Sequence, residues 1–111
     1  QRPLEGFVVA DFCNVIAGPA CGRMLAELGA TVYKIGPPDP QHGPMVMLVW
    51  QAELHQGKRS IILDSSQKEG RDVIQNIIAK SDILLVNKMD HQLPRLGLDR
   101  ASLDKVNKKI I

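Results

Sequence analysis

Aromatic residues are scarce in this sequence, making up 4% of its 111 residues. So few aromatic side chains leave little material for the stacking surfaces on which proteins bind single-stranded nucleic acids. Neither sign of charge dominates, because 14 basic residues offset 12 acidic ones for a formal net charge of +2. Proteins that bind nucleic acid usually carry a clustered basic stripe instead. We therefore expect no nucleic-acid partner.

Long hydrophobic runs are missing as well. No apolar run approaches the ~20 residues that are needed to cross a bilayer. The first apolar stretch, 7–10, stops at Asp11 and has no small-residue cleavage pattern behind it. We therefore predict neither a membrane segment nor a signal peptide.

Cysteine is limited to Cys13 and Cys21. A lone pair at this spacing fits neither a zinc ribbon nor a disulfide scaffold. It favours two reduced, half-buried thiols in a cytoplasmic protein. The histidines are far apart and show no metal-ligand spacing, so no metal site is expected; they are His42, His55 and His91.

The residues that are present suit one globular domain over 1–111. Apolar residues make up 44% and charged residues 23%, an ordinary balance for a folded protein. An apolar run at 7–12 has the length of a strand, and the apolar residues of 17–28 follow at helical spacing. Gly29 is a good helix stop, and the β-branched segment 31–35 reads as a second strand. This order predicts a strand–helix–strand unit.

An irregular segment interrupts the alternation. The residues 36–40 contain three prolines and must form a loop, because proline lacks an N–H and bars a helix. The apolar run 45–50 could be a strand or a buried helix, and periodicity does not decide between them.

The second half returns to strands and helices. Strands are predicted at 60–63 and 83–86, and Ile110 and Ile111 look like the opening of another. Ser66 and Glu69 match a capping box, which predicts the start of a helix that ends near Lys80. A short helix is expected over 101–106 with Asp99 as its cap. The whole pattern predicts an α/β fold, Rossmann-like and three-layered, with a mostly parallel sheet covered on both faces.

Two segments carry candidate chemistry from their residues alone. The loop 14–18 precedes a helix N-terminus, which is a natural anion or cofactor site, although a plain turn is the alternative. The segment 57–60 resembles the tail of a phosphate loop, but Ala52 and Arg59 stand where a Walker A motif needs Gly and Ser or Thr. Its two cations could hold a phosphate or form a solvated turn. The carboxylates at element ends are interpreted as structural caps; they are Asp11, Asp64 and Asp82.

Several ordered motifs cover most of the chain. They are Pro3–Gly6, Ala17–Pro19, Leu25–Ala30, Gly57–Ile61, Leu63–Asp64, Glu69–Gly70, Asp82–Leu84, Asn87 and Arg95–Leu98. In this order and spacing they resemble the N-terminal segment of the family III CoA-transferases, the group that includes formyl-CoA transferase, carnitine CoA-transferase and alpha-methylacyl-CoA racemase.

The resemblance implies that a Rossmann-like large domain binds coenzyme A or an acyl-CoA thioester, and that two chains interlock as a homodimer. No covalently bound cofactor is expected. The positions that the resemblance assigns to CoA binding are Asn14, Val15, Ile16, Ala17, Lys58, Asn87, Arg95 and Leu96. The cations in this set suit the 3′-phosphate and the diphosphate of CoA.

The sequence departs from the family pattern at three places. Gly36–Pro38 stands where the family commonly has a Glu, often with a nearby Arg. The residues 88–91 lack the aromatic residue and the Pro-Gly turn that follow the asparagine at Asn87, and His55 replaces another asparagine. The family's catalytic aspartate lies downstream of the matched segment, so no catalytic residue is assigned here.

Three functions remain open. The first is a module that binds CoA or acyl-CoA and performs no transfer alone, either as a short protein or as a piece of a longer enzyme. The second is a non-catalytic module that has lost CoA binding and pairs with itself or with another chain, for which an exposed sheet edge near 110–111 would offer a surface. The third is an enzyme whose site is completed by a second polypeptide. The acyl group is not indicated, because the residues that select it in the family lie largely outside this segment.

Overall fold

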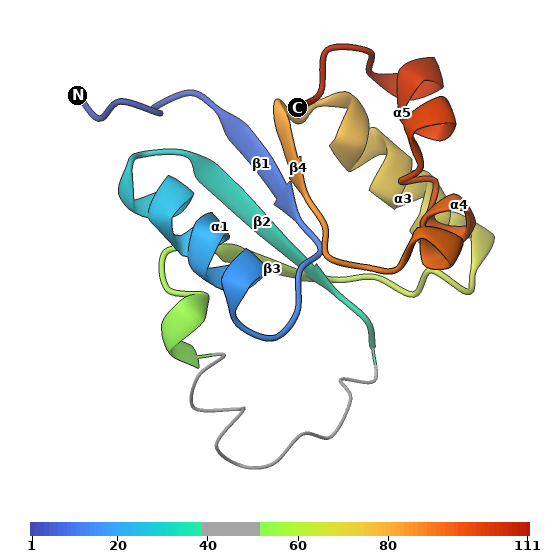
Figure 1. The fold of residues 1–111 in the computed structure, drawn as a ribbon, viewed down its shortest axis with the longest axis horizontal. Helices are drawn as coiled ribbons and strands as arrows, with labels where there is room; N and C mark the ends of the chain where they lie inside the picture. Colours follow the sequence, from blue (N-terminus) through green and yellow to red (C-terminus); the bar gives the residue numbers. More distant parts are fainter. Residues whose placement is uncertain (39–51) are drawn as a thin grey trace.

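The computed structural model describes residues 1–38 and 52–111 and contains one parallel sheet (Figure 1). Its four strands are β1 (Val8–Asp11), β2 (Thr31–Gly36), β3 (Arg59–Ile62) and β4 (Ile83–Leu85), in the order β3-β2-β1-β4. All three strand pairs are parallel. The apolar run 45–50, which the sequence left undecided, lies outside the described residues.

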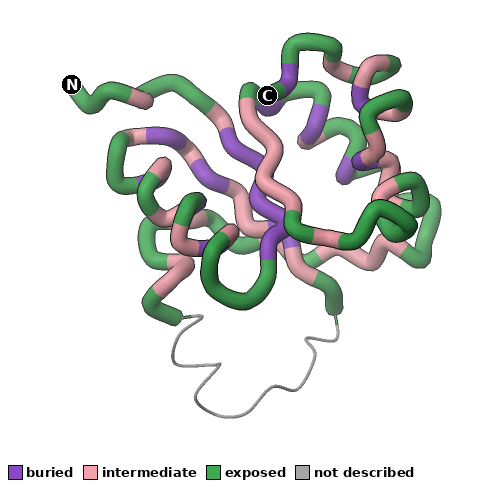
Figure 2. Tube along the Cα trace, in the orientation of Figure 1, coloured by how far each residue is buried: buried purple, intermediate pink, exposed green. Residues whose placement is uncertain are grey.

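Helices cover both faces of the sheet, as the sequence predicts. The helices include α1 (Ala17–Glu27), α3 (Lys68–Ala79), α4 (Leu93–Leu96), α5 (Arg100–Val106) and the 3-10 turn η1 (Asp90–Gln92). Along β1, Val9 packs in one apolar cluster with Ala26 of α1, and Ala10 packs in another with Ile74 of α3. Successive strand residues point to opposite faces, so β1 is buried on both sides and lies at the centre of three layers (Figure 2). The Rossmann-like, three-layer α/β fold is therefore confirmed.

Gly29 ends α1, as predicted, through a positive φ of 108°. Its N–H donates to the Ala26 carbonyl at 3.0 Å, and the Ala30 N–H donates to the Leu25 carbonyl at 3.0 Å. These two bonds are those of a Schellman motif, which glycine permits because it lacks a Cβ. The turn sends the chain directly into β2.

The predicted capping box at the start of α3 is wrong. The helix begins at Lys68 after Gln67, and no side chain caps it. The Ser66 hydroxyl instead donates to Asp64 Oδ1 at 2.6 Å, and the Ser66 N–H donates to the same oxygen at 3.0 Å. A carboxylate two residues back is a charged acceptor within easy reach, so it competes successfully for the serine.

The C-terminal segment follows the predictions more closely. Asp99 caps α5 by accepting the Ser102 N–H at 3.3 Å. Ile111 is not assigned to a strand, but its N–H donates to the Asp82 carbonyl at 3.0 Å and its carbonyl accepts from the Leu84 N–H at 2.8 Å. These bonds place it along the edge of β4 as an extension of the sheet. The short elements η1 and α4 were not predicted.

Helix α1 lies unusually close to the sheet at Gly22. A Cβ added there would lie 2.6 Å from Asp11 Oδ2 and 2.9 Å from Lys58 Nζ. Real Cβ atoms do not approach other heavy atoms this closely, so only glycine fits between the helix and these two side chains. No helix among the described residues is long and apolar enough to cross a membrane.

Replacing Gly22 with alanine is expected to lower the free energy of unfolding by about 1–3 kcal/mol, the usual cost of overpacking a core. The loss should occur even though alanine is intrinsically the better helix former by about 1 kcal/mol. Urea denaturation of both chains measures it. Gly36→Ala is the matched control, because its Cβ would meet no atom of residues 1–38 and 52–111 within 4 Å. A Gly22→Ala chain more stable than the unmodified one would contradict the close approach.

Candidate functional site

A buried ion pair lies at the carboxyl end of the sheet, beneath the start of α1. Lys58 Nζ lies 2.7 Å from Asp11 Oδ2, and the two side chains are 1% and 0% exposed. Asp11 ends β1 and shares the α1 side of the sheet with Val9, because residues two apart on a strand point the same way. Lys58 reaches this carboxylate from the turn before β3, across β2. The pair therefore ties together strands that are not neighbours.

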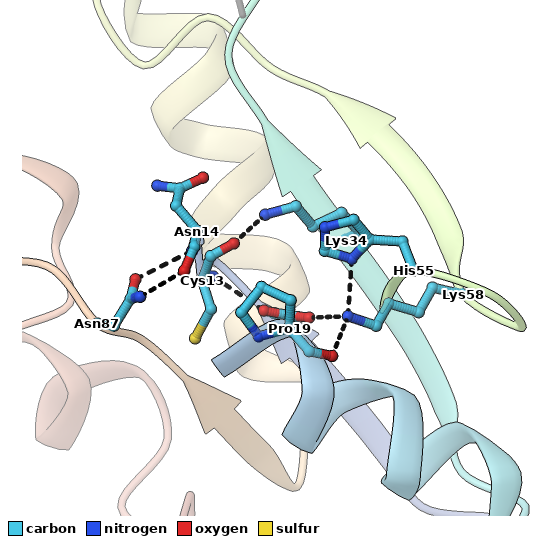
Figure 3. Close-up of polar contacts among 8 residues, drawn as sticks. Cys13, Asn14, Pro19, Lys34, His55, Lys58 and Asn87 are labelled. Carbon is cyan, nitrogen blue, oxygen red and sulfur yellow. Dashed lines mark hydrogen bonds and ion pairs between the residues drawn. The ribbon is translucent and has the colours of Figure 1, made fainter. Parts of the chain in front are cut away.

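Lys58 uses its other protons on two further acceptors (Figure 3). It donates to the Pro19 carbonyl of α1 at 2.9 Å and to His55 Nδ1 at 2.8 Å. Burial, followed by the nearby charges of Lys58 and Lys34, lowers the pKa of His55 to about 4. His55 is therefore neutral at physiological pH and presents Nδ1 as an acceptor. The ammonium of Lys58 is fully satisfied, as a buried charge must be.

A second lysine approaches the same carboxylate from β2. Lys34 donates its ammonium proton to the Cys13 carbonyl. Burial is the largest cause that lowers the pKa of Lys34; Asp11 opposes this shift, while Lys58 and Lys88 add to it. Two lysines thus lie beside one buried carboxylate, and Lys88 lies close enough to act on Lys34, which leaves an excess of positive charge at this edge of the sheet.

Above this charge lies the loop 14–17, and all four of its residues are exposed. Val15 has a φ of 71°, a left-handed conformation that is costly for a β-branched residue. No side chain caps the first turn of α1, whose N-cap is Ile16. The exposed backbone N–H groups at a helix start attract anions, and the helix dipole adds to this attraction.

Asn87 holds this loop from the segment after β4. Its Oδ1 accepts the Asn14 N–H at 3.1 Å, and its Nδ2 donates to the Asn14 carbonyl at 2.7 Å (Figure 3). On the other side, Asp11 Oδ1 accepts the Cys13 N–H at 2.9 Å. The loop is therefore anchored to the ends of β1, β2 and β4.

The structure brings six of the eight predicted CoA-binding residues to this edge. The loop residues are Asn14, Val15, Ile16 and Ala17; Asn87 contacts the loop, and Lys58 lies beneath it. Arg95 is exposed on α4, and Leu96 packs against the apolar cluster on the α3 face. No hydrogen bond or ion pair within 1–38 and 52–111 links Arg95 or Leu96 to the loop.

Sequence reasoning missed how the polar side chains combine. Asp11, interpreted from the sequence as a cap, also forms the buried ion pair with Lys58. Lys34 was not among the predicted site residues. His55 was noted only as a family departure, although it accepts from Lys58. One signal was available, since Asp11 and Lys34 occupy the ends of adjacent parallel strands, where ligands commonly bind.

The two thiols differ from the half-buried pair that the sequence suggested. Both are free, but Cys13 is buried and Cys21 is exposed. Burial, with the nearby Asp11 carboxylate, raises the pKa of Cys13 to about 12, so it remains a protonated thiol rather than a nucleophile. Among the described residues, no group of three His, Cys, Asp or Glu side chains could hold a metal ion.

Acid should destabilise this chain through His55. The folded pKa of about 4 lies below the ordinary 6.5, so the unfolded chain binds more protons between these values. The free energy of unfolding should therefore fall as pH falls from 6.5 toward 4. His55→Asn keeps an acceptor for Lys58 without a titrating group and should flatten this slope in urea titrations at several pH values.

His91→Asn is the matched control, because His91 is exposed. It should leave the slope unchanged. Equal slopes for His55→Asn and the unmodified chain would show that His55 is not held neutral in the fold.

Comparison with known proteins identifies the family of this chain. The sequence profile of CoA-transferase family III matches residues 4–111. The formyl-CoA:oxalate CoA-transferase of Bradyrhizobium sp. is 34% identical over 118 residues, covering 99% of this chain and 28% of the relative. The succinate–glutarate CoA-transferase of Agrobacterium fabrum is 32% identical over 125 residues, covering 100% of this chain and 31% of the relative.

A solved structure agrees with these sequence matches. The crystal structure of a hypothetical protein from Mycobacterium tuberculosis superposes with a TM-score of 0.90 at 27% identity, covering 100% of this chain and 32% of that one. The chain thus spans less than a third of the length of each of these relatives. With a profile match over nearly its whole length, this chain belongs to CoA-transferase family III.

Proposed function

We propose that this chain binds coenzyme A or an acyl-CoA thioester at the loop 14–17, and that it transfers no CoA by itself. The observation that carries the proposal is an exposed, uncapped helix start that lies above the buried Asp11–Lys58 pair, with a further, partly buried cation at Lys34. CoA offers a matching partner, because its diphosphate and 3′-phosphate are polyanionic. Membership of a CoA-transferase family supports the same ligand.

The chemistry of the loop suits both halves of such a ligand. Backbone N–H groups and the dipole of α1 favour a phosphate by about 0.3–1 kcal/mol for each well-placed charge. Val15 and Ile16, 54% and 45% exposed, offer apolar surface to the pantetheine arm. Lys58 stabilises the site from beneath the loop and does not contact the ligand, because its buried ammonium is paired with Asp11. Arg95 and Leu96 remain proposed contacts at a greater distance along the ligand.

Catalysis is proposed to need more than this segment. The relatives carry over two thirds of their length outside the region they share with this chain. The resemblance assigns the family's catalytic aspartate to that further region. We infer that transfer requires such residues, supplied in a homodimer or by a second chain, in the cytoplasm where CoA thioesters are used.

An Ala17→Glu substitution should separate ligand binding from stability. Ala17 is exposed in the first turn of α1, where a carboxylate stabilises the helix but repels a phosphate. The affinity for CoA should therefore fall by about tenfold, equivalent to about 1.4 kcal/mol, without loss of stability. Isothermal titration calorimetry and thermal unfolding measure the two effects.

Ala101→Glu is the matched control, because it places the same carboxylate in the first turn of α5. It should bind CoA like the unmodified chain. Pantetheine, which lacks the phosphates, should bind more weakly than CoA and should not distinguish Ala17→Glu from the control. The absence of any heat of binding at millimolar CoA would count against the proposed function and favour a partner-binding module.

A further inference from the structure

The loop 14–17 is held by polar side chains that could otherwise bind a ligand directly. Asn87 is the clearest case, because both polar atoms of its amide are already paired with the backbone of Asn14. An amide that accepts the N–H and donates to the carbonyl of one residue fixes the orientation of that residue. The contact spans 73 positions of sequence, so it brings the segment after β4 against the segment after β1.

The opposite side of the loop is held in the same manner. Lys34 donates to the Cys13 carbonyl, while Asp11 Oδ1 accepts the Cys13 N–H at 2.9 Å. Two consecutive residues, Cys13 and Asn14, therefore have both backbone polar groups bound by side chains. Those side chains come from the ends of three adjacent strands, β2, β1 and β4.

Immediately after this doubly held segment comes the strained residue. Val15 has a φ of 71°, and left-handed backbone at a non-glycine residue persists only where its surroundings impose it. The four anchoring bonds on Cys13 and Asn14 are the surroundings that precede it. Without them, Val15 would relax toward an ordinary φ, and the N–H groups that follow would turn away from their present direction.

We propose that Asn87 and Lys34 are positioning residues, which act on the ligand through the backbone of Cys13 and Asn14 by fixing the loop 14–17 before binding. This inference rests on the proposed function, since it assigns the roles of two side chains at that site. It changes the role of Asn87 from a direct ligand contact to a clamp. It also gives Lys34, a residue outside the set expected from the family, a part in binding.

The test combines a measurement without ligand and one with CoA. Asn87→Ala removes both bonds to Asn14, so the Asn14 amide should exchange with solvent about tenfold faster in NMR hydrogen exchange. The affinity for CoA should weaken about five- to tenfold, as expected for the loss of one or two hydrogen bonds. Asn76→Ala, at an exposed position of α3, is the matched control and should change neither quantity.

Lys34 provides a second and independent variant. Lys34→Met keeps the length of the side chain but removes the donor to the Cys13 carbonyl, and should weaken CoA binding in the same range. Lys34→Arg restores a cationic donor and should recover most of the affinity. Lys80→Met, at the exposed end of α3, controls for the loss of one positive charge.

The outcomes separate this inference from the proposed function. Weaker CoA binding by Asn87→Ala with an unchanged Asn14 exchange rate would identify a direct ligand contact and overturn the clamp. An unchanged affinity for CoA in Asn87→Ala would also overturn the clamp. If the unmodified chain binds no CoA, the proposed function fails, and the exchange rate alone decides whether the clamp exists. Should Asn87→Ala fail to fold, the Lys34 variants decide: faster Asn14 exchange and weaker CoA binding in Lys34→Met, both restored in Lys34→Arg, support the clamp. Weaker binding without faster exchange contradicts it.

Discussion

The buried pair between Asp11 and Lys58 is the interaction on which the rest of the structure depends. It joins the end of β1 to the turn before β3, and the same ammonium donates to the Pro19 carbonyl of α1. Because both side chains are excluded from water, removing either one would leave an uncompensated charge, at a typical cost of about 3–5 kcal/mol. The pair also explains why α1 carries Gly22 at its closest approach to the sheet.

The same arrangement prepares a surface for an anion. Asp11 uses one oxygen for Lys58 and the other for the Cys13 N–H, so the ion pair beneath and the loop above share one carboxylate. Lys34 and Lys88 add positive charge that this carboxylate does not balance. The result is a strained, exposed loop at a helix start. It is held by side chains that already form hydrogen bonds with the backbone of Cys13 and Asn14. A ligand can then meet a preformed site and need not pay to order it.

The sequence predicted the elements well because their signals are local. Apolar strands, the helical spacing of α1 and the stop at Gly29 need no knowledge of the rest of the chain. The capping box failed for a local reason as well, because Asp64 outcompetes the helix for Ser66. The site was harder to predict. The resemblance located the loop 14–17, but the contacts that Lys34 and Asn87 make with it join residues 21 and 73 positions apart, and no spacing rule reveals them.

The most direct test of the account is NMR mapping of CoA on the isotopically labelled chain. Unlabelled CoA should shift the backbone amide signals of the loop 14–17 and the start of α1 in a saturable way, with weaker changes at Asn87 and Lys34. The amides of α5, on the opposite layer, should stay in place. Saturable shifts confined to α5 or to the edge at Ile111, or no shifts at millimolar CoA, would contradict the claim that this loop is the ligand site.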